Sequence, residues 1–193
     1  MDGRNSYLIL IELTHALVQL RKGEVKMRET NHFVFFWKGD DIFSNFYYAP
    51  FIHQGIEFKW SEQAVMYRKA KLFGADEIAL QILKAKTPKM CKDLGRSRQI
   101  PFREDVWKNA RETIYKEVLV DKFSVPKLKA KLLATGDKIL AEASPYDTIW
   151  GIGYAENHCY AEDPAKWIGL NLLGKVLMEV RGELAEKVSV QEK

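Results

Sequence analysis

The sequence predicts one α+β domain that is predominantly helical and contains a small β-sheet. Three observations lead to this fold class. Hydrophobic residues recur at helical spacing through most of the chain after residue 60, the segments that resemble strands are short, and 193 residues suit one domain with a sizeable core. We expect the folded domain over residues 31–185, a helical extension and linker over residues 1–30, and a tail over residues 186–193.

The extension and most of the predicted strands lie in the first third of the chain. Apolar residues at loose helical spacing, followed by a charged stretch, predict a helix and then a linker over residues 1–30, to which we assign no chemistry. The aromatic run over residues 32–37 is bounded by a Gly-Asp-Asp turn and predicts a strand. A Gln-Gly pair between apolar residues predicts a hairpin over residues 51–58.

Capping residues delimit the helices that follow. Ser61 and Gly74 are a typical N-cap and C-cap for one helix. Thr87 before Pro88 is typical of a helix start, because proline at the first helical position has no N–H to leave unpaired. The predicted helices in this part of the chain cover residues 61–74, 75–86 and 88–95.

The second half of the chain contains the longest helical patterns. Trp107, Ala110, Ile114 and Val118 form the apolar stripe of one amphipathic helix. The last helical segment is apolar nearly all round in its middle, which predicts a central helix packed on several sides. The predicted elements are helices over residues 103–123 and 126–136, a strand over residues 138–143, and a final helix from Asp163-Pro164 to about Leu184.

Composition limits the classes of function. The net charge of +4 and pI of about 8.9 fit an anionic small ligand and do not by themselves indicate nucleic acid. The apolar run over residues 7–13 is too short to cross a membrane, and no signal peptide is evident. The two cysteines and four histidines show no metal-ligand spacing, so we expect no metal and no cofactor. Thiols without partners favour a reducing compartment, the cytoplasm.

Glu62 and Lys69 form the most informative pair in the sequence. Placed on a helical wheel, both fall within the apolar arc that Val65, Met66 and Ala70 define. Charged groups on a buried face are costly unless they pair or take part in chemistry. The alternative is structural: Glu62 would favour the helix N-terminus, and the Lys69 stem would be buried with its amine in water.

Four further segments carry residue types suited to ligand binding. Asn45 lies between aromatic residues that could hold a sugar or a base, or that only pack together. Arg96 follows a helix end and is suited to phosphate, or belongs to a solvated basic loop. Trp107 either packs in the core or stacks on a base. Asp147 and Trp150 lie near two glycines in a loop where backbone could closely approach a ligand.

Asn171 is a fifth candidate. It lies within the nearly all-apolar final segment, where an amide needs hydrogen-bond partners. Two roles would give Asn171 such partners: it could cap a neighbouring element, or it could contact the substrate.

These pieces together resemble the NADAR family, also called YbiA-like proteins, over about residues 33–183. Each motif is moderately specific, whereas the ordered set is highly so. Leu170 departs from the family pattern, since many relatives have a polar residue there, and this affects one detail of the pocket wall. The resembling motifs are Phe43-Ser44-Asn45-Phe46, Trp60-Ser61-Glu62-Gln63, Lys69, Gly95-Arg96, Arg103 with Trp107, Tyr146 to Gly153, and Asn171 to Arg181.

The resemblance implies a mostly helical α+β fold and an N-glycosidase that cleaves a bond between ribose and nitrogen. It implies two kinds of substrate: phosphoribosylamino-pyrimidine intermediates of riboflavin biosynthesis, and ADP-ribose attached to guanine, including in nucleic acid. An NAD- or ADP-ribose-binding sensor without turnover is the alternative, and an interaction through residues 1–30 is a third class. The assigned residues are Glu62, Lys69 and Asp147 for catalysis, and Asn45, Arg96, Trp107, Trp150 and Asn171 for substrate binding.

Two routes to hydrolysis are compatible with these residues. In one, a deprotonated Lys69 attacks the ring-opened sugar carbon and forms a Schiff base, while Glu62 transfers protons. In the other, a carboxylate stabilises an oxocarbenium-like state and activates water. Neither route calls for a metal, and the sequence does not fix an oligomeric state.

Overall fold

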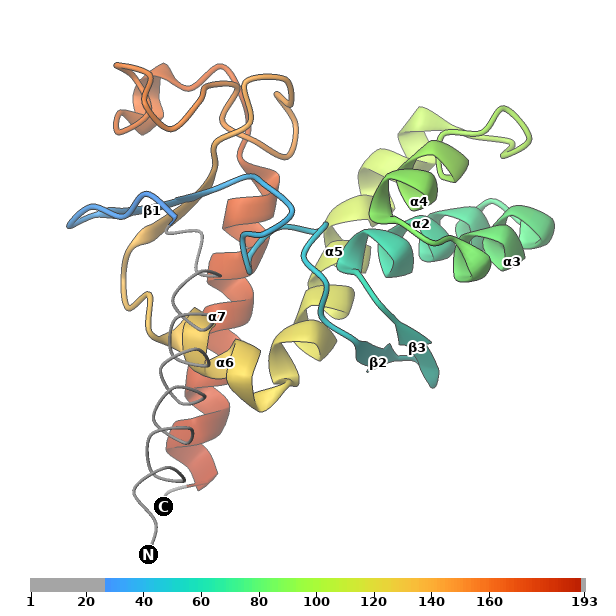
Figure 1. The fold of residues 1–193 in the computed structure, drawn as a ribbon, viewed down its shortest axis with the longest axis horizontal. Helices are drawn as coiled ribbons and strands as arrows, with labels where there is room; N and C mark the ends of the chain where they lie inside the picture. The colour runs from blue at the N-terminus through green and yellow to red at the C-terminus, as the bar shows by residue number, and fades with distance from the viewer. Residues whose placement is uncertain (1–26, 192–193) are drawn as a thin grey trace, which may run out of the picture.

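The computed structural model describes residues 27–191 and confirms a mostly helical α+β fold with little sheet (Figure 1). Most of the predicted extension, residues 1–26, lies outside the described residues. The strands are β1 (Phe33–Phe36), β2 (Phe51–His53), β3 (Ile56–Phe58) and β4 (Ile139–Glu142). The helices are α2 (Ser61–Leu72), α3 (Asp76–Lys84), α4 (Pro88–Leu94), α5 (Glu104–Ser124), α6 (Pro126–Leu133), the 3₁₀ helix η1 (Pro164–Lys166) and α7 (Leu172–Gln191).

Strands β1 and β4 are far apart in sequence and pair in parallel, with Phe33 opposite Ile139 and Phe36 opposite Glu142. Both faces of this pair are buried: Val34 joins the main core, whereas Phe35 joins a second, smaller cluster. A strand covered on both faces is apolar at every position, which explains the aromatic run in β1. Because the strands are parallel, their carboxyl ends meet at one edge and the chain leaves both strands there.

Helix α5 connects two groups of helices. In Figure 1, α2, α3 and α4 lie together on one side of α5, and α6 and α7 lie on the other. Helix α5 packs on both α2 and α7, and α7 packs in turn on β4. The β2–β3 hairpin docks on α5, where His53 Nδ1 lies 2.7 Å from Asp121 Oδ2. Buried side chains of α2, α5, α7 and β4 therefore belong to one continuous core.

The start of α2 differs from the prediction. Trp60, rather than Ser61, occupies the N-cap position, and Ser61 is the first helical residue. The Ser61 hydroxyl does not cap the helix, because it donates a hydrogen bond of 3.0 Å to Asn45 Oδ1. At the other end Phe73 is the C-cap, and Gly74 follows it with a φ of 68°.

The predicted helix from Asp163 to Leu184 is wrong in its first half. Residues Pro164–Lys166 form a single 3₁₀ turn, and α7 begins only at Leu172. The intervening backbone instead pairs with an earlier loop: the amide of Asn171 donates to the carbonyl of Gly151 over 3.0 Å. Apolar periodicity cannot reveal such a pairing, since its hydrogen bonds connect segments about 20 residues apart. The C-terminal end also differs, because α7 continues to Gln191 through most of the predicted tail.

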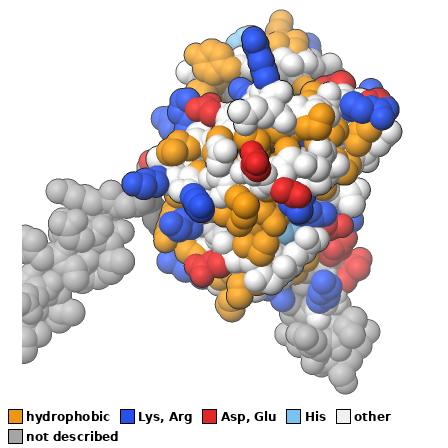
Figure 2. All heavy atoms as spheres, turned by 90° about the vertical axis from the view of Figure 1, so that its right-hand side faces the viewer, with side chains coloured by type: hydrophobic (Ala, Val, Ile, Leu, Met, Phe, Trp, Pro, Cys, Tyr) orange, Lys and Arg blue, Asp and Glu red, His pale blue; other side chains and the backbone are white. Residues whose placement is uncertain are grey.

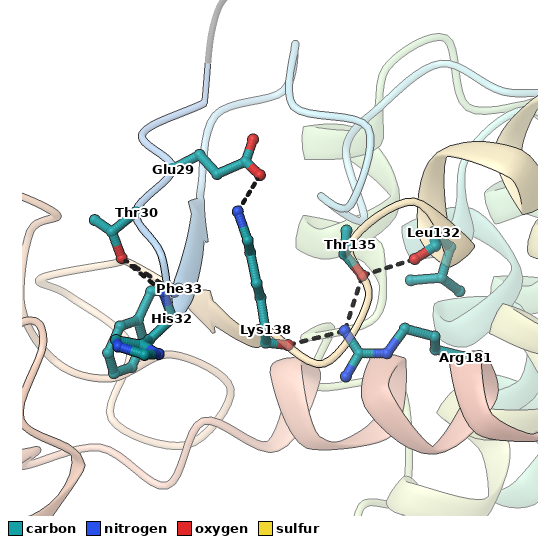
Figure 3. Close-up of polar contacts among 8 residues, drawn as sticks. All are labelled: Glu29, Thr30, His32, Phe33, Leu132, Thr135, Lys138 and Arg181. Atoms are coloured by element: carbon teal, nitrogen blue, oxygen red, sulfur yellow. Dashed lines mark hydrogen bonds and ion pairs between the residues drawn. The ribbon is translucent and has the colours of Figure 1, made fainter.

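Polar contacts fasten α7 to the chain that enters β4 (Figure 3). Arg181 Nη1 donates to Thr135 Oγ1 and to the Lys138 carbonyl, each over 2.8 Å. Thr135 is buried, and its hydroxyl donates to the Leu132 carbonyl at the end of α6. One guanidinium therefore joins α6, α7 and β4.

We expect the change Arg181→Met to lower the free energy of unfolding by about 1–3 kcal/mol, since it leaves two partly buried acceptors without a donor. Urea unfolding followed by circular dichroism measures this loss. Lys175→Met, at an exposed position of the same helix, is the control and should stay within about 0.5 kcal/mol of the wild type. Equal stability of the two variants would show that the Arg181 contacts contribute nothing.

Candidate active site

A pocket of about 270 Å³ lies where the carboxyl edge of β1 and β4 meets α2, α4 and α5. The structure brings seven of the eight predicted site residues to its wall; the exception is Asn171. The predicted residues that line it are Asn45, Glu62, Lys69, Arg96, Trp107, Asp147 and Trp150. Residues outside that set of eight join them: Trp37, Ser44, Phe46, Met66, Lys92, Tyr115 and Glu142.

Glu62 lies in the first turn of α2 and is only 4% exposed. Its amide donates to the Asn45 carbonyl over 3.0 Å, which fixes the backbone at this point. Burial raises the pKa of the Glu62 carboxyl to about 7, although the nearby positive charges of Lys92 and Arg96 lower it. A carboxyl group with this pKa can both give and accept a proton near neutral pH.

Lys69 reaches the same pocket from two turns further along α2. Its Nζ donates to the Gly95 carbonyl over 2.8 Å and lies 4.4 Å from the centre of the Phe102 ring. Burial lowers the pKa of the Lys69 amine, and the neighbouring charge of Arg96 lowers it further. A lysine with a lowered pKa has a larger neutral, nucleophilic fraction at neutral pH.

Glu142, the last residue of β4, is a pocket residue that the sequence analysis missed. Burial raises the pKa of its carboxyl to about 8, and the negative charge of Asp147 adds to this effect. Its Oε2 atom is buried and makes no hydrogen bond within the described part of the chain. The sequence did contain a signal for Glu142. It is an acidic residue at the carboxyl end of an apolar strand, five residues before Asp147.

The loop after β4 brings Asp147 and Trp150 to the pocket. Asp147 Oδ1 accepts hydrogen bonds from the amides of Ile149 and Trp150, over 2.9 and 2.7 Å. This carboxylate therefore shapes its own loop in addition to lining the pocket. Trp150 stacks on Tyr115 of α5 with ring centres 3.6 Å apart, so one of its faces is covered by the protein.

Basic and polar groups also line the pocket. Asn45 and Phe46 come from the loop after β1, Lys92 from α4, and Arg96 from the turn that follows α4. Lys92 Nζ lies 5.6 Å from the centre of the Phe46 ring. Two cations and an amide beside a sugar-sized pocket are suited to phosphate oxygens.

The aromatic residues of the pocket differ in accessibility. Trp107 is buried, and Lys69 Nζ lies 5.4 Å from the centre of its ring. Trp37, directly after β1, is 39% exposed and packs in a tilted arrangement on Tyr146, with ring centres 5.9 Å apart. The amides of Trp37 and Lys38 donate to the buried Asp41 carboxylate, which holds this turn. Trp37 therefore offers the larger open aromatic surface.

Comparison with known proteins identifies the family. The NADAR domain model matches residues 35–185, which is most of the chain. The chain belongs to the NADAR domain family. It is 37% identical to the N-glycosidase R617 of Acanthamoeba polyphaga mimivirus, over 80% of this chain and 98% of that protein. It is 34% identical to the chloroplastic riboflavin biosynthesis protein PYRR of Zea mays, over 83% of this chain and 26% of that protein.

The fold agrees with the family assignment. The NMR structure of the Escherichia coli protein YbiA matches with a TM-score of 0.67 and 27% sequence identity, over 86% of this chain and 92% of that chain. The NADAR match over residues 35–185 includes every residue that lines the pocket. The candidate active site therefore belongs to the shared part of the fold.

Asn171 lies behind this NADAR pocket rather than on its wall. It has a φ of 52° and directly precedes α7, so it is not within a helix as predicted. Its amide nitrogen donates to the Leu140 carbonyl over 2.9 Å, and its amide oxygen accepts from the Glu142 amide over 3.0 Å. Of the two roles that the sequence left open, the structure places Asn171 in the capping role, at the end of β4 that carries Glu142.

The glycines of the loop after β4 also have a different role from the predicted one. A Cβ on Gly151 would lie 2.8 Å from the Asp147 carbonyl oxygen and 2.9 Å from that of Glu142. Gly151 therefore permits close packing within the protein, not close approach of a ligand.

The described residues contain no group of three or more His, Cys, Asp or Glu side chains placed to hold a metal ion. Within residues 27–191, none of the helices is long and apolar enough to cross a membrane. On the face shown in Figure 2, basic, acidic and hydrophobic side chains are intermixed. The basic character is therefore not gathered into one patch on that face.

We expect Glu62→Gln to stabilise the protein at pH 8 and to have no effect near pH 4. The folded protein holds a proton on Glu62 up to about pH 7, whereas the unfolded chain releases it above the ordinary value of 4.5. The wild type therefore loses stability as the pH rises through this window, by at most about 3 kcal/mol, and the amide removes that loss.

Thermal unfolding of both proteins between pH 4 and pH 8 measures the effect. Glu57→Gln is the control, because Glu57 is exposed in the hairpin and should show no such trend. A constant difference between Glu62→Gln and the wild type at all pH values would contradict the assignment.

Proposed function

We propose that this protein is an N-glycosidase that hydrolyses the bond between a ribosyl carbon and a nitrogen. One observation carries the proposal: two buried carboxyl groups, Glu62 and Glu142, have pKa values near neutrality in the pocket that also contains Lys69. A carboxyl group that keeps its proton at neutral pH can donate it to the leaving nitrogen. The printed names of the relatives, N-glycosidases R617 and YbiA, support this reaction class.

The Schiff-base route uses Lys69 as nucleophile. A protonated pocket carboxyl gives its proton to the ring oxygen, the C1–O bond breaks, and C1 becomes an iminium. Lys69 Nζ adds to C1, and Glu62 moves a proton from Nζ to the leaving nitrogen, so that the base leaves as an amine and a Schiff base remains on Lys69. Water then adds to the imine, with Glu62 as base, which frees the sugar and regenerates the lysine. The lowered pKa of Lys69 supports this route, because only the neutral amine can attack.

The direct route uses only the carboxyl groups. One protonated carboxyl would protonate the leaving nitrogen, while Asp147 would stabilise the oxocarbenium-like sugar and orient its hydroxyls. The first group, now a carboxylate, would take a proton from the water that adds to C1. Both routes need acids and bases that the pocket already contains, so we propose hydrolysis without a metal. Cys91 and Cys159 are free thiols, which supports the cytoplasm as the compartment.

Two substrate classes fit the pocket. Lys92 and Arg96 suit the phosphate of a phosphoribosylamino-pyrimidine, and the name of the maize relative, a riboflavin biosynthesis protein, favours this class. The same cations suit the diphosphate of ADP-ribose. The open aromatic pair of Trp37 and Tyr146 favours a substrate with a base at the mouth, such as ADP-ribosylated guanine.

The experiment that tests the function offers both substrates to the purified protein. Mass spectrometry follows release of the free base and of the free sugar phosphate. Turnover of the phosphoribosylamino-pyrimidine alone assigns clearance of a metabolite, and turnover of an ADP-ribosylated guanine oligonucleotide alone assigns reversal of a modification. Binding of ADP-ribose or NAD without any turnover would replace the enzyme with a sensor.

We expect Glu62→Gln and Lys69→Ala each to lower kcat at least about 100-fold, as removal of a proton-transfer group or nucleophile does. Initial rates with the better of the two substrates measure the loss, and circular dichroism verifies the fold. Lys71→Ala is the matched control, since Lys71 lies on the same helix and is paired with Asp76 outside the pocket. Normal turnover by either pocket variant would show that the central pair is wrong.

Borohydride reduction under turnover separates the two routes. The Schiff-base route predicts a covalent sugar adduct on the peptide that contains Lys69, and the direct route predicts none. The Lys71→Ala protein should be trapped as efficiently as the wild type.

We expect Trp37→Ala to raise KM by about 10-fold or more with a smaller change in kcat, because stacking on a base contributes about 1–3 kcal/mol. Steady-state kinetics with the substrate identified above measures this. Tyr48→Ala is the control, since Tyr48 is 60% exposed, packs on Trp60 and does not line the pocket. An unchanged KM in Trp37→Ala would place the base elsewhere, on Trp107 or Trp150.

A further inference from the structure

Lys122 of α5 is a buried lysine that the proposed reaction does not use. Its exposed fraction is 0%, and it forms no ion pair with the described residues. The Tyr47 and Phe123 rings lie 5.9 and 5.1 Å from its Nζ. Burial lowers the pKa of the Lys122 amine to about 7. Burying a lysine without a carboxylate partner is costly, so its contacts require an explanation.

The contacts of Lys122 lead towards the pocket in two steps. Its Nζ donates to the Ser44 carbonyl over 2.9 Å and to Ser61 Oγ over 3.5 Å. The Ser61 hydroxyl donates in turn to Asn45 Oδ1 over 3.0 Å. Asn45 lines the pocket, whereas Ser61 and Lys122 lie behind the wall.

The direction of these hydrogen bonds is determined by donor chemistry. The protonated lysine amine has three N–H groups and no lone pair, so it donates to both Ser44 and Ser61 and accepts from neither. Ser61 Oγ then accepts from Lys122, and its single proton goes to the nearer of the two Asn45 oxygens, the side-chain Oδ1 at 3.0 Å rather than the main-chain carbonyl at 3.4 Å. The Asn45 side-chain nitrogen is left, and it makes no hydrogen bond within residues 27–191. An amide held in this way presents N–H donors to the pocket.

We propose that Lys122 is a positioning residue that, through Ser61, fixes the Asn45 amide with its nitrogen towards the pocket. In this orientation the Asn45 amide donates a hydrogen bond to an oxygen acceptor on the ligand, such as a phosphate or hydroxyl oxygen. A ligand with a hydrogen-bond donor at the same position is disfavoured. Only the nature of the ligand rests on the proposed N-glycosidase function. The orientation of the amide is a property of the protein alone.

The first experiment measures the orientation without a ligand. In a ¹⁵N-labelled protein, the side-chain amide signal of Asn45 is assigned by its loss in Asn45→Ala. We expect the signal to shift, and its exchange with solvent to accelerate, in Lys122→Met and in Ser61→Ala. Arg181→Met is the matched control, because it removes a partly buried cation on α7 that does not line the pocket. It should leave the signal unchanged.

An unchanged Asn45 signal in Ser61→Ala would overturn the proposal. This variant decides the question even if Lys122→Met does not fold, because it removes the central contact by deleting one oxygen atom. A shift in the Arg181→Met control equal to that in Ser61→Ala would also overturn it, since the effect would then reflect general loosening.

The second experiment asks whether the amide acts on a ligand. We expect Lys122→Met, Ser61→Ala and Asn45→Ala each to weaken ribose 5-phosphate binding by about 10-fold, measured by calorimetry. The double variant Ser61→Ala, Asn45→Ala should bind no more weakly than Asn45→Ala, because Ser61 acts only through Asn45. Additive losses would contradict the proposal. Absence of binding and turnover in the wild type would refute the N-glycosidase function and leave the amide measurement to decide the role of Lys122.

Discussion

Glu62 is buried in the first turn of α2, where its amide donates to the Asn45 carbonyl and so fixes the backbone. Burial raises the pKa of the carboxyl to about 7, so the group can stay neutral, and the cations Lys92 and Arg96 lower the cost of its negative charge. The loop after β1, the α4 turn and the loop after β4 all meet at this point. A carboxyl group that is useful near pH 7 therefore results from packing, not from residue type alone.

The parallel pairing of β1 with β4 makes this convergence possible. The two strands are about 100 residues apart, yet their carboxyl ends share one edge, so Trp37 and Glu142 lie at the same wall. Asn171 ties the end of β4 to the start of α7 through two hydrogen bonds from its side chain. Helix α7 therefore contributes to the pocket indirectly, because it holds β4 in position and β4 carries Glu142. Residues outside the pocket therefore help to position the residues that line it.

The pocket brings together groups of different chemistry. Two titratable carboxyl groups, Lys69, the cations Lys92 and Arg96, and the partly exposed Trp37 all line it. This set suits the proposed ribosyl N-glycoside, which combines an anionic phosphate, a reacting sugar carbon and an aromatic base. The proposed reaction and the proposed role of Lys122 both follow from that arrangement, since a fixed amide donor is useful only where an acceptor oxygen is expected.

The sequence by itself determined the fold class and the positions of most elements, and its resemblance to the NADAR family indicated seven of the pocket residues. Caps such as Thr87 and a helical stripe such as that of α5 act over one or two turns, so local patterns reveal them. Only the tertiary structure decided the start of α7, the capping role of Asn171 and the membership of Glu142, Tyr115 and Trp37 in the pocket. The physical reason is that these features depend on hydrogen bonds and burial between segments that are distant in the chain. The residue pattern within one segment does not reveal which distant segment it contacts.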